Sequence, residues 1–419
     1  MMNNYSEPDL LPVESLQRNV PLPFIALAIG MISSYIPDLL PGGIGVNISY
    51  LGWIIPLLGC GWVVLKKPFF ITFPLGLWFL WAVWVVFYLS FATAEHALQR
   101  SVMLLTPLVV GAGFSTLNVD TELIEQFSLW LSRFFWIFIA VAGVATGLLS
   151  AGQLYDVSGF AAGSITASLL AVWFAVLYTG GDRLALPYWA VLALVPVLAV
   201  TRTGMVAVAL TLPLTLAPLA IKKRLLVLVL LLAGGSVVFQ LDRVQNKMFY
   251  SGSGTVSDAA RGMTDLFTGN SQGRSGDFAT SGRQAMSEEL LAHMDEAYWF
   301  GHGSNTTEAV TMAIGGLTHP HNDWLRVRYE YGMFGLLIFA FSMLAQMRHA
   351  QRRASLAPGG SSIFFYAGAG AFIPMAIFMF SDNVMLYAAW FGNLQFAMLG
   401  LGYAALRSMQ PDGLQDDAL

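Results

Sequence analysis

The segment THPHNDWL at residues 318–325 carries the strongest chemical signal in the sequence. An imidazole titrates near neutral pH, so His321 can accept a proton from a hydroxyl group and act as a general base. A histidine at a membrane interface can equally do no more than cap a helix. The spacing of the residues alone leaves both interpretations of His321 open.

The residues around His321 predict a helix that starts at the membrane surface. Pro320 suits the first turn of a helix, and Asp323 suits its positive N-terminal end. On such a helix His321, Leu325 and Arg328 share one face, because they are spaced by four and by seven residues.

The sequence offers no convincing metal site. His319 and His321 are two residues apart, so they would not share a helix face, and no third ligand stands nearby. The one cysteine, Cys60, lies inside an apolar run, which excludes a cysteine-type metal site and an intrachain disulfide. We therefore expect neither a metal ion nor another cofactor.

Arg202 lies in the sequence VTRTG at residues 200–204, between two apolar segments. An arginine at membrane depth is costly and usually has a partner. Its guanidinium group can hold a phosphate through two parallel hydrogen bonds. A side chain at a helix end that snorkels to the interface would explain Arg202 as well.

Arg283 closes the sequence SGR inside a long loop at residues 241–317. The loop contains nine acidic and five basic residues, so Arg283 does not belong to a general basic patch. Arg283 is a candidate for anion binding, and Arg274 is a nearby competitor for that role. A surface salt bridge with Glu288 is the simpler alternative for Arg283.

Weaker candidates that would support such a site are His319, Asn322, Arg328 and Asp382. Asp382 and Asn383 interrupt the apolar stretch between the last two expected spans, where they would either line a cavity or form a bare turn. Arg326 and Glu330 are four residues apart and are expected to pair with each other.

The composition indicates a membrane protein. Hydrophobic residues make up 56% and charged residues 11% of the 419 residues, whereas about 25% of a typical soluble domain is charged. A net charge of −4 gives no indication of nucleic-acid binding. A spanning helix needs about 20 mostly apolar residues, which predicts an all-α polytopic membrane protein with about twelve transmembrane helices. The predicted spans are 20–40, 46–65, 68–92, 101–117, 126–149, 161–179, 185–201, 204–221, 225–241, 333–347, 362–381 and 384–406.

Lysine and arginine gather in the loops that face the cytoplasm if the N-terminus lies inside. With an even number of spans both termini are cytoplasmic, and the loop at 241–317 lies on the opposite side. The chain then divides into nine helices at 1–240, the loop domain at 241–317, a motif helix with the last three spans at 318–406, and a tail at 407–419.

The loop has two parts. Residues 251–283 are rich in glycine and serine, which predicts an irregular segment. Apolar residues then recur every four residues, which predicts an amphipathic helix on an apolar surface such as the rim of the bundle. These residues are Met286, Leu290, Met294 and Tyr298.

In their order and spacing, these motifs resemble the O-antigen ligase and O-antigen polymerase superfamily of bacterial inner membranes. The histidine motif of that family matches His321-Asn322, followed after nine residues by Gly332 and after two more by Gly335. The resemblance depends on the ordered set of motifs and on no single one of them.

Two further motifs carry the same resemblance. TRTG at 201–204 closes one span, and SGR at 281–283 is followed by a Gly-x-Gly turn at 301–303. The resemblance is specific over residues 195–340 and topological elsewhere. It implies a membrane glycosyltransferase fold of the GT-C-like type, with the active site between the bundle and a periplasmic loop.

The resemblance also implies a glycan linked to undecaprenyl diphosphate as the donor. It implies His321 as the general base, and Arg202 and Arg283 as the arginines that bind the diphosphate. Arg274 remains an alternative to Arg283. The leading expectation is an O-antigen ligase, which transfers the glycan to lipid A–core by an inverting, metal-independent reaction.

Two alternatives within the superfamily differ in the acceptor: an O-antigen or exopolysaccharide polymerase, and a protein O-oligosaccharyltransferase. A transporter of a lipid-linked glycan is an alternative of another class. It would bind the same donor through the same arginines but would need no general base.

Overall fold

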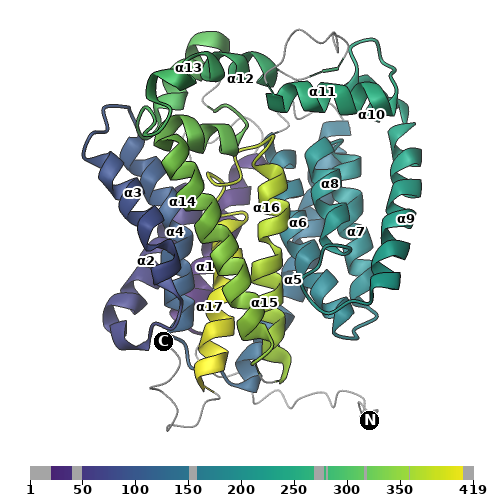
Figure 1. Cartoon of the computed structure of the whole chain (residues 1–419). Helices are drawn as coiled ribbons and strands as arrows, with labels where there is room; N and C mark the ends of the chain where they lie inside the picture. Colours follow the sequence, from purple (N-terminus) through teal and green to yellow (C-terminus); the bar gives the residue numbers. More distant parts are fainter. Residues whose placement is uncertain are drawn as a thin grey trace.

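The computed structural model describes residues 20–39, 50–150, 158–268, 278–279, 282–315, 319–357 and 359–408. In these parts of the chain the regular structure is helical, apart from one isolated β-bridge between Phe249 and Phe278. Helices run side by side in a bundle, and the helices between residues 242 and 315 lie across one end of it (Figure 1).

The bundle contains α1 (Leu22–Leu39), α2 (Leu51–Lys66), α3 (Phe79–Leu89), α4 (Ala97–Ser115), α5 (Thr121–Ser150), α6 (Ser158–Thr179), α7 (Ala185–Leu198), α8 (Arg202–Thr211), α9 (Ile221–Phe239), α14 (Asp323–Ala354), α15 (Ser362–Gly370), α16 (Phe372–Phe378) and α17 (Gly392–Ser408). The helices across its end are α10 (Asp242–Met248), α11 (Val256–Thr268), α12 (Arg283–Ala292) and α13 (Thr306–Gly315).

Three helices of the described chain are long and apolar enough to cross a membrane: Ala97–Ser115, Thr121–Gly143 and Asp323–Ala354. The bent pair Ile221–Phe239 and Asp242–Met248 makes up to four, and six more apolar helices are shorter. The protein is therefore an all-helical protein of membrane type, and the count of about twelve spans stays a prediction.

Several predicted spans differ from the helices. In the span predicted at 68–92, the α-helix α3 covers only Phe79–Leu89, and the span predicted at 362–381 is divided into α15 and α16. The helix α8 ends at Thr211 instead of reaching residue 221, and α17 begins at Gly392 instead of residue 384. Residues 384–391 form turns, although their side chains are apolar and mostly buried. An apolar segment indicates that its side chains are buried. Turns inside a bundle are buried in the same way as helices, so apolar residues alone do not distinguish the two.

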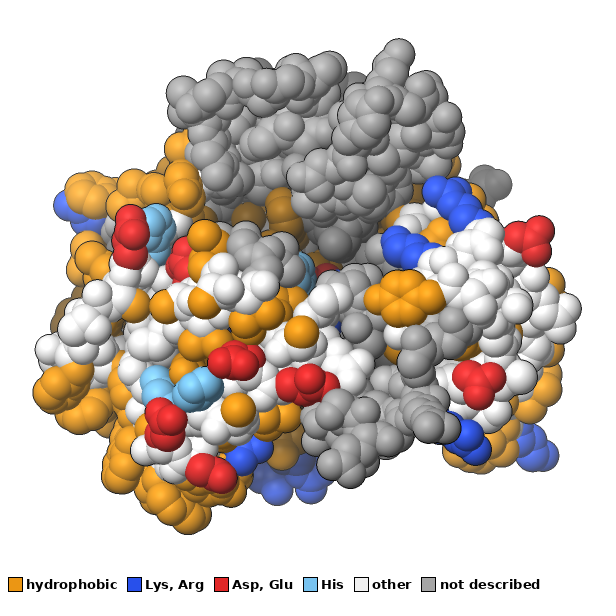
Figure 2. Space-filling view, turned by 90° about the horizontal axis from the view of Figure 1, so that it is seen from above, with side chains coloured by type: hydrophobic (Ala, Val, Ile, Leu, Met, Phe, Trp, Pro, Cys, Tyr) orange, Lys and Arg blue, Asp and Glu red, His pale blue; other side chains and the backbone are white. Residues whose placement is uncertain are grey.

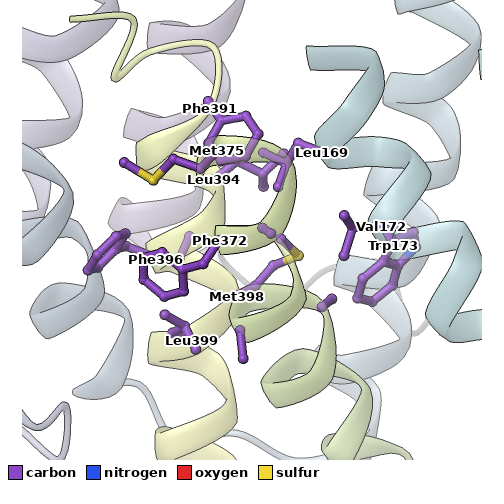
Figure 3. Packing of buried hydrophobic residues seen from close by; sticks show 14 of the residues in the cluster. Leu169, Val172, Trp173, Phe372, Met375, Phe391, Leu394, Phe396, Met398 and Leu399 are labelled. Atoms are coloured by element: carbon purple, nitrogen blue, oxygen red, sulfur yellow. The ribbon is translucent and has the colours of Figure 1, made fainter. Parts of the chain in front are cut away.

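The helix α17 lies at the centre of the bundle. All its residues from Gly392 to Ala405 are buried, and it packs against α4 and α15. Apolar side chains of α6, α16 and α17 meet in this core (Figure 3). A Cβ on Gly400 would lie 2.4 Å from the carbonyl oxygen of Gly111, so α17 and α4 are in backbone contact. Such close approach is typical of helix packing in membranes.

The helix α14 is broken at Gly332, where φ is 71°. The break leaves backbone carbonyls of α14 free to accept from the Gly-x-Gly turn at 301–303, which lies between α12 and α13. The amides of His302 and Gly303 donate to the carbonyls of Tyr329 and Glu330, both at 2.9 Å. The Gly-x-Gly turn thereby clamps the loop to α14.

Two glycines of this clamp, Gly332 and Gly301, have no space for a side chain. A Cβ on Gly332 would lie 2.2 Å from the carbonyl oxygen of Trp299, and one on Gly301 would lie 2.4 Å from the amide nitrogen of Gly332. Gly301 also has a positive φ of 78°. The motif glycines therefore bring two backbones into contact.

The amphipathic segment of the loop lies on the bundle, as expected. Leu290 and Met294 are buried against Leu325 and Tyr329 of α14. The segment is a shorter helix than the spacing predicts, because α12 ends at Ala292 and a 3-10 turn follows it.

The prediction of an irregular segment at 251–283 is wrong for part of its length, because α11 forms there. Its start is fixed by a reciprocal pair of hydrogen bonds. The backbone amide of Thr255 donates to the Asp258 carboxylate at 2.9 Å, and the amide of Asp258 donates to the Thr255 hydroxyl at 3.2 Å. These hydrogen bonds thus stabilise the start of a helix in a segment that contains few apolar residues.

Candidate active site

His321 precedes α14 and adopts a left-handed conformation, with φ at 50°. The helix starts at Asp323, and Asn322 is its N-cap, whose Oδ1 accepts from the amide of Leu325 at 2.9 Å. The expectation that His321 shares a helix face with Leu325 and Arg328 is therefore wrong. Because the cap sets the helix start, it turns the imidazole away from the helix.

His321 faces the turn that follows α16. Its Nδ1 lies 3.6 Å from Oδ1 of Asp382 and 3.3 Å from Nδ2 of Asn383. The His321 side chain is 30% exposed, whereas that of Asp382 is only 10% exposed. The Asp382 carboxylate is held in place, because its Oδ1 also accepts from the backbone amide of Asn383 at 2.9 Å.

This arrangement defines which ring nitrogen is available for chemistry. Oδ1 of Asn383 is buried and has no hydrogen-bond partner in the described structure. A half-turn of the amide would let this oxygen accept from a protonated Nδ1 of His321. With Nδ1 oriented by Asp382 and Asn383, Nε2 is left as the proton acceptor.

Arg202 is the first residue of α8, and it is bound to the loop. Its Nη2 donates to the carbonyl of Ala279 at 2.8 Å, and its guanidinium lies over the ring of Phe278 at 4.9 Å. Its Nη1 is buried without a hydrogen-bond partner in the described structure. The loop thus holds the Arg202 side chain in place and leaves Nη1 as an available donor. Both features favour ligand binding over a side chain that snorkels to the interface.

The first turn of α8 adds backbone amides beside this guanidinium. The N-cap residue, Thr201, makes no side-chain cap hydrogen bond, because its hydroxyl pairs with Ser164 at 2.5 Å. The N-terminal amides of a helix carry a partial positive charge and suit an anion.

Arg202 lines an open cavity of about 500 Å³ at the end of the bundle where the loop lies. Charged and polar side chains occupy much of this end face, and apolar ones gather along much of its rim (Figure 2). The cavity is lined by Ser164, Val200, Thr201, Arg202, Thr203, Gly204, Lys247, Arg283, Phe378, Ser381 and Asp382. It therefore contains three basic residues and one acidic residue.

The basic residues of the cavity repel one another. Burial and the neighbouring charges of Arg202, Arg283 and Arg243 lower the pKa of Lys247. Burial likewise lowers the pKa of Arg283, while the Asp382 carboxylate opposes this shift. An anion bound among these groups would relieve their repulsion.

Asp382 joins the two halves of the site, since it lines the cavity and lies beside His321. The predicted residues His321, Arg202, Arg283 and Asp382 are thus brought together from four distant segments. Arg283 lines the cavity together with Asp382, whose carboxylate opposes the lowering of the pKa of Arg283. Glu288 accepts from Gln284 at 2.9 Å, and no ion pair of Glu288 with Arg283 is present in the described structure. Arg274 lies outside the described residues.

The other candidates lie elsewhere. His319 is 3.3 Å from Nη2 of Arg100 on α4, and Arg328 lies over the ring of Tyr298 at 5.2 Å. Neither His319 nor Arg328 is among the residues that line the cavity.

The charges of Arg326 and Glu330 interact, but no ion pair within 4.0 Å joins them in the described structure. Arg326 instead pairs with Asp323 at 3.0 Å, and Glu330 accepts from the hydroxyl of Thr307. Asp323 also accepts from the amide of Met385 at 2.7 Å. This second contact fixes the turn after α16 against the start of α14, and so sets the distance between His321 and Asp382.

Lys247 was not a sequence-based candidate. It lies in the last turn of α10 in a loop with an acidic excess, and no motif surrounds it. Its position depends on the sharp bend of 81° between α9 and α10, which the sequence does not reveal.

Chemically, the site combines an oriented imidazole with a cationic cavity. Such a site can take a proton from a nucleophile while it stabilises an anionic leaving group. Among the described residues, no group of three or more His, Cys, Asp or Glu side chains is arranged to hold a metal ion.

Residues 187–340 match the model of a protein family described as O-antigen ligase. No curated protein matches the chain. The matched segment includes Arg202, Arg283 and His321, whereas Asp382 lies beyond it. The match supports the O-antigen ligase superfamily.

Proposed function

We propose that this chain is an O-antigen ligase of the bacterial inner membrane. It would transfer a preassembled glycan from undecaprenyl diphosphate to a sugar of lipid A–core in the periplasmic leaflet. The single observation that carries the proposal is Asp382, which lies 3.6 Å from the imidazole of His321 and lines the cavity of Arg202 and Arg283. The family match supports the superfamily of ligases and polymerases.

The arginines act on the leaving group. When the anomeric carbon–oxygen bond breaks, its electron pair moves to the diphosphate, and negative charge gathers there. Arg202 and Arg283 stabilise this charge more strongly in the transition state than in the ground state. The free Nη1 of Arg202 and the first amides of α8 supply donors for the phosphate oxygens.

His321 acts on the acceptor. Its Nε2 takes the proton of the acceptor hydroxyl as the hydroxyl oxygen bonds to the anomeric carbon. The imidazolium that forms is stabilised by Asp382. A base on the face opposite the leaving diphosphate implies inversion at the anomeric carbon.

The membrane placement is part of the proposal. Apolar helices and the family match agree with a membrane protein. We place the loop at 241–317 on the periplasmic side and both termini in the cytoplasm, with about twelve spans in a GT-C-like fold. In that placement, the cavity opens to the leaflet that holds the carrier and the acceptor.

The proposal is tested with purified protein, a carrier-linked glycan and rough lipopolysaccharide. The wild type should produce glycosylated lipid A–core, and His321→Ala should abolish transfer while donor binding persists. A transporter would keep its activity without the imidazole, so full activity of His321→Ala contradicts a ligase. Transfer to a second carrier-linked glycan, or to a protein, would instead indicate the polymerase or the protein-modifying enzyme.

A further inference from the structure

Lys247 occupies a position in the cavity that the proposed mechanism has not used. The bend of 81° between α9 and α10 brings α10 across the end of the bundle, and Lys247 lines the cavity with Arg202 and Arg283. Lys247 is only partly buried, and among the contacts of the described chain its Nζ contacts only the carbonyl of Ala199, at a long 3.5 Å. The ammonium group therefore retains donors for a ligand.

We propose that Lys247 is a third ligand of the carrier diphosphate and makes the cavity selective for a diphosphate over a monophosphate. This inference rests on the proposed function, because it assumes that the cavity holds the leaving group. It adds Lys247 as a third basic ligand of the cavity, and it adds diphosphates as the class of ligand that the cavity selects.

The charges support this role of Lys247. Three basic side chains against the one carboxylate of Asp382 leave the cavity with two positive charges. A diphosphate esterified at both ends carries about two negative charges, so the donor and the cavity match. Without Lys247 the cavity would have one positive charge, which suits a monophosphate diester instead.

The charge of the diphosphate and the charge of the site also match after the reaction. The acceptor hydroxyl gives its proton to His321, its oxygen bonds to the anomeric carbon, and the carbon–oxygen bond to the diphosphate breaks with its electron pair. The released diphosphate gains close to one further negative charge, since its terminal phosphate has a second pKa of about 6. His321 gains one positive charge beside Asp382 in the same step.

The crowding of cations supports the same conclusion. Arg202 and Arg283 both act on Lys247, and no carboxylate is among the groups that shift its pKa. The Asp382 carboxylate opposes the lowering of the pKa of Arg283. Asp382 is the one carboxylate in the lining of the cavity against three basic side chains, so a phosphate of the ligand can supply the counter-charge that Lys247 lacks.

The test measures binding of two ligands to the purified full chain in nanodiscs, a glycan linked to undecaprenyl diphosphate and a sugar linked to undecaprenyl monophosphate. Both are esterified at both ends, so they carry about two and about one negative charges. Lys247→Met removes the charge and keeps the length of the side chain. We expect it to weaken diphosphate binding by about 10- to 100-fold, the usual loss of a charge-assisted hydrogen bond. Monophosphate binding should change by less than about threefold, and Lys247→Arg should restore most of the diphosphate affinity.

Arg243→Met is the matched control, because Arg243 is an exposed basic residue of α10 that does not line the cavity. Equal losses for both lipids, an unchanged affinity for diphosphate, or an equal loss in Arg243→Met would each overturn the inference. The unfolding temperature of each variant shows that the binding measurement concerns folded protein.

This binding test needs no acceptor, so it separates the two proposals. If the wild type transfers glycan and Lys247→Met binds diphosphate normally, the role of Lys247 is wrong and the ligase stands. If no acceptor is glycosylated but the diphosphate preference depends on Lys247, the inference stands and the ligase fails.

Discussion

Nδ1 of His321 lies 3.6 Å from Oδ1 of Asp382, although the two residues come from the start of α14 and from the turn after α16. The contact fixes the imidazole at the edge of the cavity that Asp382 lines. In the proposed mechanism, the acceptor lies on the side of His321 and the diphosphate on the side of Arg202.

Replacement of Asp382 by asparagine should separate catalysis from binding. Asp382→Asn removes the charge that stabilises the imidazolium of His321, so we expect kcat to fall by about 10- to 100-fold. The cavity becomes more positive, so donor affinity should stay equal or increase. Steady-state kinetics with a direct binding assay would check this; a loss of donor affinity at unchanged kcat would refute the role of Asp382.

Replacement of Arg202 should act on the leaving group. Arg202→Ala removes a donor aimed at the developing charge, and removal of one such donor typically costs about 2.7–4 kcal/mol, or 10²–10³ in kcat. Single-turnover transfer rates measure this loss. Arg183→Ala is the control, since Arg183 is exposed in the turn between α6 and α7 and does not line the cavity. Similar rates for the two variants would argue against arginine stabilisation.

Arg202→Lys should remain strongly impaired. Arg202 already uses Nη2 for the carbonyl of Ala279, and its buried Nη1 is free at the same time. A lysine presents one nitrogen and cannot reproduce this forked geometry. Transfer at wild-type rates by Arg202→Lys would show that charge alone suffices.

Gly332→Ala tests the clamp between the loop and α14. The residue has a φ of 71°, and the new Cβ would meet the carbonyl oxygen of Trp299 at 2.2 Å. Strain at such a position costs about 1–3 kcal/mol, so the unfolding temperature should fall and transfer should decrease with it. Gly234→Ala in α9, where a Cβ meets nothing within 4 Å, should leave both unchanged or slightly improved.

Treatment with a chelator should leave transfer intact. Arg202, Arg283 and the first amides of α8 provide the counter-charge for the diphosphate in the proposed mechanism. Transfer rates after dialysis against EDTA, with and without added magnesium, measure the effect. A loss of transfer that added magnesium reverses would contradict the arginine mechanism.

The helices of the bundle could be predicted from the sequence, because long apolar segments have few other ways to satisfy their backbone in lipid. The start of α17 could not, since residues 384–391 are apolar and yet form turns held by a tertiary hydrogen bond from Met385 to Asp323. In the sequence, Gly332 could be identified only as part of a motif. The helix breaks there because its backbone contacts those of Trp299 and Gly301.

Members of the candidate site could be predicted where their residue type and the neighbouring sequence are enough to identify them. His321, Arg202 and Arg283 stand out by residue type and motif, and Asp382 by its polarity in an apolar stretch. Lys247 has no such signal, because its role depends on the bend between α9 and α10. The contact of His321 with Asp382 likewise depends on how α14 packs against the end of α16.

The most direct test of the central claim is an experimental structure of the protein in nanodiscs with undecaprenyl diphosphate bound. We predict the diphosphate in the cavity, within hydrogen-bond distance of Arg202 and Arg283, with Nε2 of His321 turned toward the position of the anomeric carbon. A diphosphate bound away from these arginines, or screened from His321 by the bundle, would contradict the account.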